Sequence, residues 1–558
     1  MFHLLKRASA PPTRDVPASM KDWFNPYEHQ KKAADKLLSN KGRMIMAHEM
    51  GTGKTVTSIY GIERLKKEGK AKNTLVVVPS GLRANFARKG LEKFLKKPSY
   101  QVVASSGEGS LANYVRPDKV QNKEWTIVSY SMFRRDPVGL MKRSGADTLV
   151  FDEFHKVRNE KSSVFAAAKQ ARPLARNFIG LTASAVNNDP SEIASLLTIS
   201  EGSRVMSPKD FKKRYTKVVG YSRGFAGGKK KIKALQRHGE MLTKVDPGVS
   251  YVSTKSLKEK SMPKKDIKFV DVPMSPDQYR LYNLALDKLG PIKKYITQKD
   301  PTVKVKDTRV LFAQTAQARQ ISNSVSMGRK MDIAESANRT PKVRRLLDDT
   351  KSHLTSNSDG KVVLYSNLVR GGVDVLSAGL KSRGIDHAVF IGKGTELGGG
   401  KVTGKSRQKG VRDFQEGKKK VIIISGAGAE GLDLPNATAF YALDGHFNPE
   451  RILQAEARAR RLGGQSHRTP EKRVVDVRRY RSVAPPSRSL FKSKVRPQTT
   501  DQWVYNTAKR KYMQNREFYN TLEKPHKYIR KYKGVDGEWK YEYPKAKKKG
   551  FFTKLLGG

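Results

Sequence analysis

Cysteine is absent from the 558 residues of this chain, and acidic side chains are scarce. The absence of cysteine excludes disulfide bonds, cysteine-ligated zinc, iron–sulfur clusters and thiol catalysis. No apolar run reaches the roughly 18 residues that a membrane-spanning helix needs, so we expect no membrane partner. Apolar residues make up 37% of the chain, which is polar for a globular protein but not typical of a disordered one. The length indicates about three to four domains.

The charge of the chain is strongly one-sided. Lys and Arg total 111 against 52 Asp and Glu, a formal charge of +59. Residues 466–558 alone carry 25 basic and 8 acidic side chains, a surplus of 17. Such an excess repels itself unless a polyanion neutralises it, and nucleic acid is the usual polyanion. The alternatives are a lysine-rich solvated surface and acidic lipid, and we favour nucleic acid.

Short apolar runs alternate with helical patterns after a leader. Residues 1–20 contain three prolines and are expected to be a disordered leader. Alternation of buried strands with charged helices is typical of a parallel sheet covered by helices on both faces, so the fold class is α/β. The expected strands of the first unit are 43–47, 74–78, 125–129, 148–151 and 177–181.

The alternation stops near residue 200 and returns after residue 335. Residues 201–335 are interpreted as a mostly helical, basic insertion, and 351–360 as a loop. The expected strands of the second unit are 361–365, 387–391, 420–425 and 439–443. The predicted domains are 21–200, the insertion 201–335, 336–480, and a C-terminal extension 481–558.

A glycine-rich loop, AHEMGTGKT at 47–55, follows the first strand and precedes a helix. Gly51 and Gly53 allow the backbone to curl so that N–H groups point at phosphates, and the helix N-terminus adds positive charge. Lys54 is suited to the β- and γ-phosphates and Thr55 to Mg²⁺. His48 stands where the usual pattern has glycine. A turn without a ligand is the alternative.

Two carboxylates, Asp152 and Glu153 in DEFH, follow a buried strand. A carboxylate pair at that place is costly unless a cation is near. In an ATPase, Asp152 would hold Mg²⁺ through water and Glu153 would orient or deprotonate the attacking water. An exposed acidic turn is the alternative.

The third motif, QAEARARRLG at 454–463, is basic and offers cations for the γ-phosphate. Arg458 and Arg461 lie three residues apart, on one face of a helix. Phosphoryl transfer needs such cations in its transition state. A solvated basic helix face is the competing interpretation.

Together and in this order, the motifs resemble those of superfamily 2 helicase-like motors, and most closely the Swi/Snf family of DNA translocases. The likeness covers about residues 24–480 and implies two RecA-like lobes that enclose ATP and Mg²⁺, with a helical Swi/Snf-type insertion. The matching segments are PYEHQ at 26–30, AHEMGTGKT, VVVPSGLRANF at 76–86, IVSYSMF at 127–133, DEFH, LTASAVNN at 181–188, MPKKDIKFVDVPMSPDQYRLY at 262–282, ARQISNS at 318–324, KVVLYSN at 361–367, the block 390–414, SGAGAEGLDLPNA at 425–437, DGHFNP at 444–449 and QAEARARRLG.

The resemblance also implies roles for individual residues. It makes Lys54, Asp152, Glu153, Arg458 and Arg461 catalytic. It assigns nucleotide binding to Gln30, Met50, Gly51, Thr52, Gly53, Lys54, Thr55, Gly431 and Asp433, and metal binding to Thr55 and Asp152. Coupling falls to Thr182, Ser184 and Gln454, although Ala183, Ser184 and Ala185 depart from the family motif. Contacts to the phosphates of nucleic acid fall to Ser80, Ser129, Ser366 and Ser425, since hydroxyls bind phosphate without reading sequence.

The C-terminal extension resembles the family at one segment only. Residues 501–511 resemble the brace helix that follows the last motif, and 501–523 look helical. Trp503 and Tyr505 are expected to be packing residues rather than base-stacking ones. The basic, aromatic end would bind DNA by charge and stacking, or form a β-hairpin around Asp536 and Gly537.

We therefore expect a DNA-dependent ATPase that moves on duplex DNA and remodels protein–DNA complexes without obligatory strand separation. The alternatives are a strand-separating DNA or RNA helicase, a viral transcription-associated ATPase with RNA polymerase as partner, and a basic virion or packaging protein. The compact motor, the absence of cysteine and the high charge favour a virus, phage or mobile element, and an intracellular, DNA-associated protein.

Overall fold

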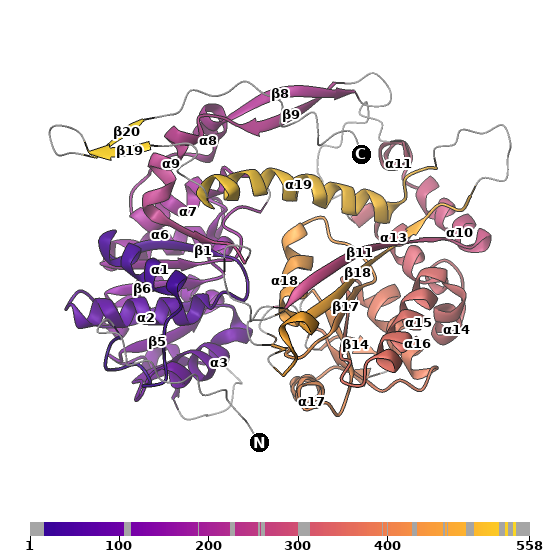
Figure 1. Cartoon of the computed structure of the whole chain (residues 1–558), viewed down its shortest axis with the longest axis horizontal. Coiled ribbons are helices and arrows are strands. Elements are labelled where there is room, and N and C mark those ends of the chain that lie inside the picture. Colours follow the sequence, from indigo (N-terminus) through magenta and orange to yellow (C-terminus); the bar gives the residue numbers. More distant parts are fainter. Residues whose placement is uncertain are drawn as a thin grey trace.

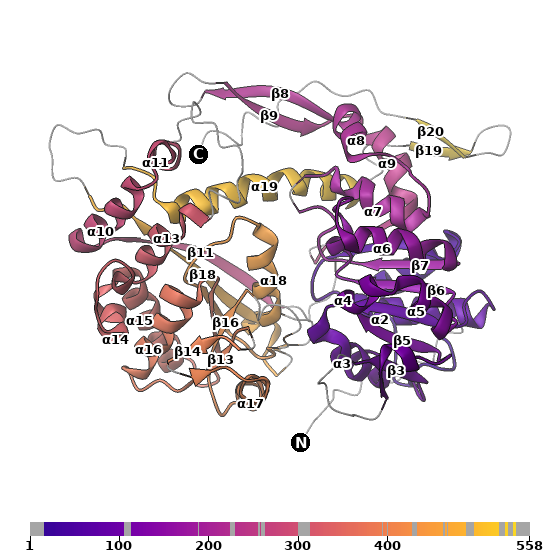
Figure 2. The same ribbon diagram turned by 180° about the vertical axis from the view of Figure 1, so that it is seen from behind.

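Two lobes lie side by side and one long helix crosses both in the computed structural model (Figures 1 and 2). The structure describes residues 16–104, 113–187, 189–223, 229–254, 257, 263–298, 313–392, 394–398, 400–426, 432, 434–460, 464–465, 467–486, 496–523, 530–533 and 539–542. The predicted fold class is confirmed, because each lobe is a parallel sheet with helices packed on it.

Lobe one is built on a sheet in the order β10-β1-β7-β6-β2-β5-β3-β4, in which neighbouring strands pair in parallel. Its strands are β1 (Arg43–His48), β2 (Thr74–Val78), β3 (Tyr100–Val103), β4 (Tyr114–Val115), β5 (Trp125–Ser129), β6 (Thr148–Asp152), β7 (Asn177–Leu181) and β10 (Val249–Val252). All five strands predicted for this lobe are present. Side chains from alternate strand positions feed two separate apolar clusters, so both faces of the sheet are buried.

Helices cover both faces of that sheet. They are α1 (Glu28–Ser39), α2 (Lys54–Lys67), α3 (Arg83–Asn85), α4 (Tyr130–Arg135), α5 (Pro137–Ser144), α6 (Ser163–Ala171), α7 (Glu192–Glu201), α8 (Pro208–Tyr215) and α9 (His238–Val245). Short helical turns η1 (Ser80–Leu82), η2 (Phe86–Glu92), η3 (Pro117–Lys119), η4 (Phe154–Val157), η5 (Arg172–Leu174) and η6 (Asp246–Gly248) connect them. Because the strands are parallel, their carboxyl ends meet at one edge, where motif residues collect.

Lobe two repeats the plan with the order β11-β18-β17-β12-β16-β13, again parallel. The strands are β11 (Lys264–Pro273), β12 (Val362–Ser366), β13 (His387–Phe390), β16 (Val421–Ser425), β17 (Ala439–Ala442) and β18 (Val474–Val483); β14 (Glu396–Leu397) and β15 (Gly400–Lys401) form a small hairpin. The helices are α10 (Pro276–Asp287), α11 (Pro291–Thr297), α13 (Ala316–Asn323), α14 (Ile333–Arg339), α15 (Pro341–Ser356), α16 (Asp374–Lys381), α17 (Gly404–Gln415) and α18 (Pro449–Ala459), with turns η7 (Val325–Met327), η8 (Val369–Val373) and η9 (Pro470–Lys472).

The segment 201–335 contains strands that the sequence did not indicate, in addition to its helices. β10 joins the edge of the lobe-one sheet and β11 the edge of the lobe-two sheet. β8 (Thr216–Arg223) and β9 (Lys229–Leu235) pair as an antiparallel ribbon that lies beyond the long helix in both views (Figures 1 and 2). The chain therefore passes from lobe one to lobe two between β10 and β11. The exact domain boundaries stay a prediction.

Three further expectations, on a loop, the leader and a hairpin, have different outcomes. The loop predicted at 351–360 is wrong for residues 351–356, because α15 continues to Ser356. Residues 1–15 of the predicted leader lie outside the described residues, whereas Met20 is buried and bridges to Leu95. β19 (Arg530–Lys533) and β20 (Trp539–Glu542) pair antiparallel, as a hairpin requires, and the turn at 534–538 lies outside the described residues.

The long helix α19 (Thr500–Glu523) belongs to both lobes. Near its start, Trp503 packs at 4.8 Å on Phe447 and is buried, as the packing interpretation predicted. Near its end, Phe518 and Leu522 are part of the lobe-one core. Figures 1 and 2 show the helix crossing from one lobe to the other. Among the described residues, no helix combines the length and the apolar character needed to cross a membrane.

Candidate active site

The glycine-rich loop lies between β1 and α2, at the carboxyl edge of the lobe-one sheet. Gly51 and Gly53 have φ of 81° and 83°, the left-handed region that favours glycine. The Lys54 ammonium donates to the carbonyl oxygens of His48 (2.9 Å) and Glu49 (3.3 Å). The Thr52 hydroxyl also donates to the Glu49 carbonyl, at 2.8 Å. The loop thus has the predicted curled form, closed over the Lys54 side chain.

His48, the departure from the usual phosphate-loop pattern, is a structural residue of β1. It is fully buried, and one ring nitrogen lies 2.9 Å from the hydroxyl of Ser250 on β10. Burial lowers its pKa to about 3, and the charge of Lys54 adds to this effect. The imidazole therefore stays neutral and fixes the strand end from which the loop departs.

Gln30 lies on the first turn of α1, directly against the glycine-rich loop. Its side-chain oxygen accepts a hydrogen bond from the Tyr27 N–H at 2.9 Å. Its side-chain nitrogen is so close that a Cβ at Gly53 would lie 2.8 Å from it. The neighbouring His29 bonds the Thr52 carbonyl through Nε2 at 2.9 Å and stacks on Tyr27. His29 was not singled out from the sequence, although it belongs to the PYEHQ segment.

Asp152 is the last residue of β6, and Glu153 follows it at the same sheet edge. Glu153 has φ of 56°, a left-handed conformation that costs a non-glycine residue of order 1 kcal/mol or more. Its backbone N–H donates to Asp152 Oδ1 at 3.0 Å. The Tyr130 hydroxyl donates to the Asp152 carbonyl at 2.7 Å. Tyr130 was quoted within a motif but given no role, and it holds this strained turn in place.

The two neighbouring carboxyl groups are both buried, but their pKa values shift in opposite directions. Burial, with the adjacent Glu153 carboxylate, raises the pKa of Asp152 above its ordinary value. Burial also acts to raise the pKa of Glu153, but the imidazole of His155 and the charges of Lys54 and Arg458 outweigh it and lower that pKa. Glu153 is therefore the more acidic of the two, and cations from both lobes act on the pair.

His155 links the carboxylates to the segment at the end of β7. Its Nδ1 lies 3.3 Å from Glu153 Oε2 and 3.2 Å from Thr182 Oγ1. The Thr182 hydroxyl in turn accepts the N–H of Ser184 at 3.1 Å. The structure thus brings together Glu153 and two of the residues predicted to couple hydrolysis to movement. Sequence reasoning had not assigned His155.

Lobe two contributes α18, whose last turn carries Arg458. The charge of Arg458 acts on both Asp152 and Glu153, which places this residue across the boundary between the lobes. Gln454 is nearly buried on the same helix. Arg460 donates instead to the carbonyl of Pro263, which begins the described part of lobe two. Gly431, Asp433 and Arg461 lie outside the described residues.

The four serines predicted to contact nucleic acid follow strand ends, but their exposure differs. Ser80 is exposed at the start of η1. Ser129, Ser366 and Ser425 are buried. The Ser129 hydroxyl caps α4 by accepting the Met132 N–H, and the Ser366 hydroxyl donates to the Asp444 carboxylate. Of the four hydroxyls, that of Ser80 is thus the accessible one.

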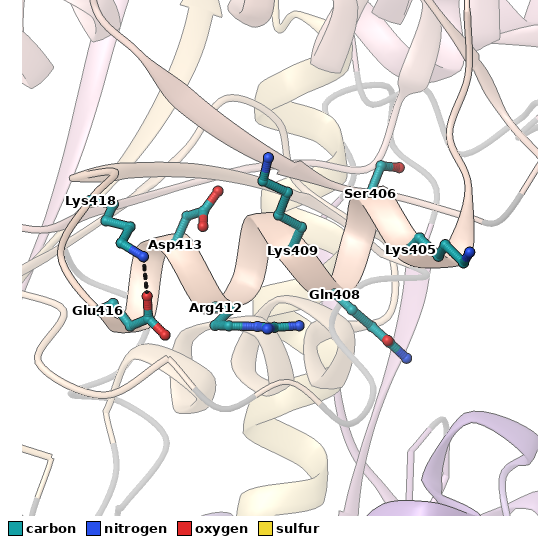
Figure 3. A pocket seen from close by; sticks show the side chains of 8 residues that line it. All are labelled: Lys405, Ser406, Gln408, Lys409, Arg412, Asp413, Glu416 and Lys418. Carbon is teal, nitrogen blue, oxygen red and sulfur yellow. Dashed lines mark ion pairs between the residues drawn. The ribbon is translucent and has the colours of Figure 1, made fainter. Parts of the chain in front are cut away.

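A separate surface pocket of about 590 Å³ lies along α17 of lobe two (Figure 3). Its lining is made by Lys405, Ser406, Gln408, Lys409, Arg412, Asp413, Glu416 and Lys418. None of the predicted site residues lines it. Within the described residues, no group of three or more His, Asp or Glu side chains is arranged to hold a metal ion.

Known proteins resemble this chain over most of its length. The Bacillus subtilis protein YqhH, an uncharacterised ATP-dependent helicase, is 24% identical over 468 residues, 79% of this chain and 73% of its own. A mimivirus protein of Acanthamoeba polyphaga, provisionally named an ATP-dependent RNA helicase, is 23% identical over 487 residues, 87% of this chain and 93% of its own. The Sulfolobus solfataricus SWI2/SNF2 ATPase core solved with dsDNA is 19% identical, with a TM-score of 0.37, covering 84% of this chain and 89% of its own.

Two family models match in succession. The SNF2-related domain matches residues 29–328 and the helicase conserved C-terminal domain matches residues 342–463. The first match alone spans more than half of the chain, and the second spans lobe two from α15 to α18. The chain belongs to the SNF2-related family and is an ATP-dependent, helicase-like motor of the Swi/Snf type.

Proposed function

We propose that this motor moves along duplex DNA by closing and opening its two lobes around ATP, without obligatory strand separation. The observation that carries the proposal is electrostatic. Arg458 of lobe two and Lys54 of lobe one act on the same two carboxyl groups, Asp152 and Glu153. A polyanionic triphosphate bound there would attract cations from both sides, which is how ATP would draw the lobes together.

The residues of lobe one fit the chemistry of ATP hydrolysis. Curled backbone from Met50 to Gly53, with Lys54, would hold the phosphates, and Gln30 would read the adenine. Thr55 and Asp152 supply a hydroxyl and a carboxylate, the oxygen donors that Mg²⁺ takes together with substrate phosphates. When bound, Mg²⁺ would neutralise charge on the phosphates. Glu153, kept ionised, would orient the attacking water and accept its proton.

Lobe two would supply the transition-state cations. Arg458 would act as an arginine finger on the γ-phosphate, with Arg461 beside it and Gly431 and Asp433 completing the nucleotide site. Loss of the γ-phosphate removes the attraction, so the lobes would separate again. Gln454 would sense this change from α18, and the link from Glu153 through His155 to Thr182 and Ser184 offers a route to the rest of lobe one.

The track is proposed to be duplex DNA. The formal charge of +59 favours a nucleic acid. Swi/Snf motors, which this sequence resembles, generally move on duplex DNA. Ser80, with the backbone around Ser129, Ser366 and Ser425, would grip phosphates at the strand ends of the two lobes. The mimivirus relative, named for RNA, makes an RNA helicase the second candidate and supports a viral relationship.

One comparison tests the proposal directly. ATP turnover is measured with duplex DNA, single-stranded DNA and RNA at equal nucleotide concentration, and triplex displacement is measured beside strand displacement. The proposal expects the largest stimulation with duplex DNA and triplex displacement without unwinding. Strongest stimulation by RNA would favour the second candidate. A transcription or packaging role would need RNA polymerase or virion components as partners. In a packaging protein Lys54→Ala would leave biological function intact.

A further inference from the structure

Glu49 faces two parts of lobe one at once. Its backbone carbonyl accepts the Thr52 hydroxyl at 2.8 Å and the Lys54 ammonium at 3.3 Å. Its carboxylate contacts the segment after β10, where Oε2 accepts the Thr254 N–H at 2.9 Å and the Thr254 hydroxyl at 2.7 Å. Tyr251 donates to Oε1 at 3.3 Å. One residue of the phosphate loop therefore holds the strand and the segment that leave lobe one.

Thr254 lies at the point where the chain leaves lobe one. It follows β10, the edge strand of the lobe-one sheet, and Lys264 begins β11 of lobe two. The backbone N–H of Glu49 also donates to the Val252 carbonyl at 2.8 Å, which extends the pairing of β1 with β10. The carboxylate thus fixes Thr254, the second residue beyond that pairing, at the start of the connection between the lobes.

The same connection is attached to α19. Ser253 donates to the carboxylate of Glu523 in the last turn of that helix. Tyr251 stacks on Tyr519, with ring centroids 4.9 Å apart and planes 19° apart. Two links join the lobes: the chain from β10 to β11, and helix α19, which starts in lobe two. A displacement of residues 251–254 would therefore move both links.

The charge of Glu49 also reaches lobe two. Burial lowers the pKa of Arg460, and the negative charges of Glu49 and Glu456 oppose that shift. Arg460 itself bonds the carbonyl of Pro263, directly before β11. The carboxylate of Glu49 therefore lies within electrostatic reach of the far end of the connection that it holds at Thr254.

We propose that Glu49 and Thr254 form a latch, a pair of positioning residues that passes the position of the phosphate loop to the connection between the lobes. Lys54 bonds the carbonyls of His48 and Glu49, and the same ammonium is the group expected to turn toward nucleotide phosphates. Its departure would remove one bond from the Glu49 carbonyl. The carboxylate of the same residue would carry the resulting backbone shift to Thr254. This inference rests on the proposed ATP-driven closure of the lobes.

The test uses substitutions at Thr254, a residue to which neither nucleotide binding nor track contact is assigned. Thr254→Val keeps the shape but removes the hydroxyl, and Thr254→Ser restores it. Ser253→Ala is the matched comparison, since it removes the adjacent bond to Glu523 of α19 and keeps both groups of Thr254 that bond Glu49. ATP affinity, turnover with and without duplex DNA, and thermal stability are measured for each full-length variant. Exposed Ser39 and Lys351, replaced by Cys in a chain without cysteine, carry spin labels that report the distance between the lobes.

The latch predicts that Thr254 affects the stimulation of turnover by DNA but not the binding of ATP. Thr254→Val should keep ATP affinity and basal turnover within about twofold of wild type. The factor by which duplex DNA stimulates turnover should fall about five- to tenfold, and most of the ATP-dependent change in label distance should disappear. Thr254→Ser should recover both. Thr254→Val with full stimulation and a full distance change would overturn the latch while the proposed function stands. Absence of stimulation and distance change in the wild type would overturn the proposed function and the latch together.

Discussion

Lys342 of α15 and Asp501 of α19 form an ion pair of 2.6 Å in which both side chains are buried, at 1% and 3% exposure. Lys342 also donates to Asn323, and Asp501 accepts the N–H of Ser482 on β18 at 2.9 Å. Asn323 continues the network to Asp444. The start of the helix that crosses both lobes is therefore fastened inside lobe two by charge and not only by apolar contact.

Asp501→Asn tests that fastening. The substitution keeps the shape but leaves the Lys342 ammonium buried without its counter-charge, which typically costs about 3–5 kcal/mol. The unfolding free energy of lobe two should fall accordingly in chemical denaturation. Glu335→Gln, in the exposed pair with Arg339, is the control and should change stability by less than about 0.5 kcal/mol. Equal effects of the two variants would contradict the role given to the buried pair.

Glu153→Gln separates ATP binding from hydrolysis. The amide cannot accept the proton of the attacking water, so turnover should fall about 10²- to 10⁴-fold while nucleotide affinity is kept. Glu124→Gln, at a carboxylate that is 53% exposed, is the matched control. Single-turnover hydrolysis and fluorescent-nucleotide binding measure the two quantities. Wild-type turnover by Glu153→Gln would refute the assignment.

Arg458→Ala tests the contribution of lobe two to the chemistry. Removing an arginine finger leaves transition-state charge without its partner, and hydrolysis should fall about 10³-fold or more. Arg344→Ala, at an exposed position of α15, controls for the loss of one positive charge. Steady-state ATP turnover with saturating duplex DNA is the measurement. Unchanged turnover would contradict the role of Arg458 and favour the interpretation of α18 as a solvated basic helix face.

Glu450 predicts a pH-dependent stability difference. This residue of α18 is nearly buried, and burial with the charges of Glu49 and Glu153 raises its pKa to about 8. A raised carboxyl pKa means that the folded state holds the proton more tightly, so its stability contribution is lost as the pH rises from about 4.5 to about 8. Glu450→Gln removes the titration. The melting temperature of the variant relative to wild type should therefore rise between pH 5 and pH 8, and a constant difference would contradict the burial argument.

Salt should weaken binding to nucleic acid steeply. If about six phosphates are neutralised, the affinity for duplex DNA falls about 10³-fold between about 50 and 200 mM salt. Fluorescence anisotropy with a labelled duplex measures the slope, and the affinity for ATP under the same conditions is the internal control. A nearly flat salt response of DNA binding would remove the electrostatic argument for the track.

The central strands of both sheets were predictable because they are buried on both faces. Runs such as TLVVV at β2 and WTIVS at β5 are continuous apolar segments, and their predicted bounds agree with the structure. β11 and β18 were missed because charges interrupt them. β11 lies at a sheet edge with most side chains exposed, and Arg481 of β18 pairs with Asp271 across the two strands. Such partners are far apart in the sequence, so no local pattern shows them.

The positions of the candidate site residues were predictable where the motifs fix the spacing along the chain. The loop from Gly51 to Thr55 and the pair Asp152–Glu153 fall at strand ends, as expected from their motifs. The supporting contacts were not predictable. His155 meets Thr182, and Glu49 meets Thr254, only after strands distant in sequence align at one sheet edge. The hydroxyls of Ser129 and Ser366 were expected to face the track but satisfy backbone and carboxylate groups within the protein.

The helix that joins the lobes is synthesised after every strand of the two lobe sheets. Lobe one has all its sheet strands once residue 252 is synthesised, whereas β11 waits for β18, some two hundred residues later, before it gains its neighbour. The sites for Phe518 and Leu522 on lobe one stay uncovered until α19 emerges. Nascent or nonsense-truncated chains ending before residue 500 would thus expose apolar patches on lobe one, and would be recognised by chaperones and proteases before any motor exists.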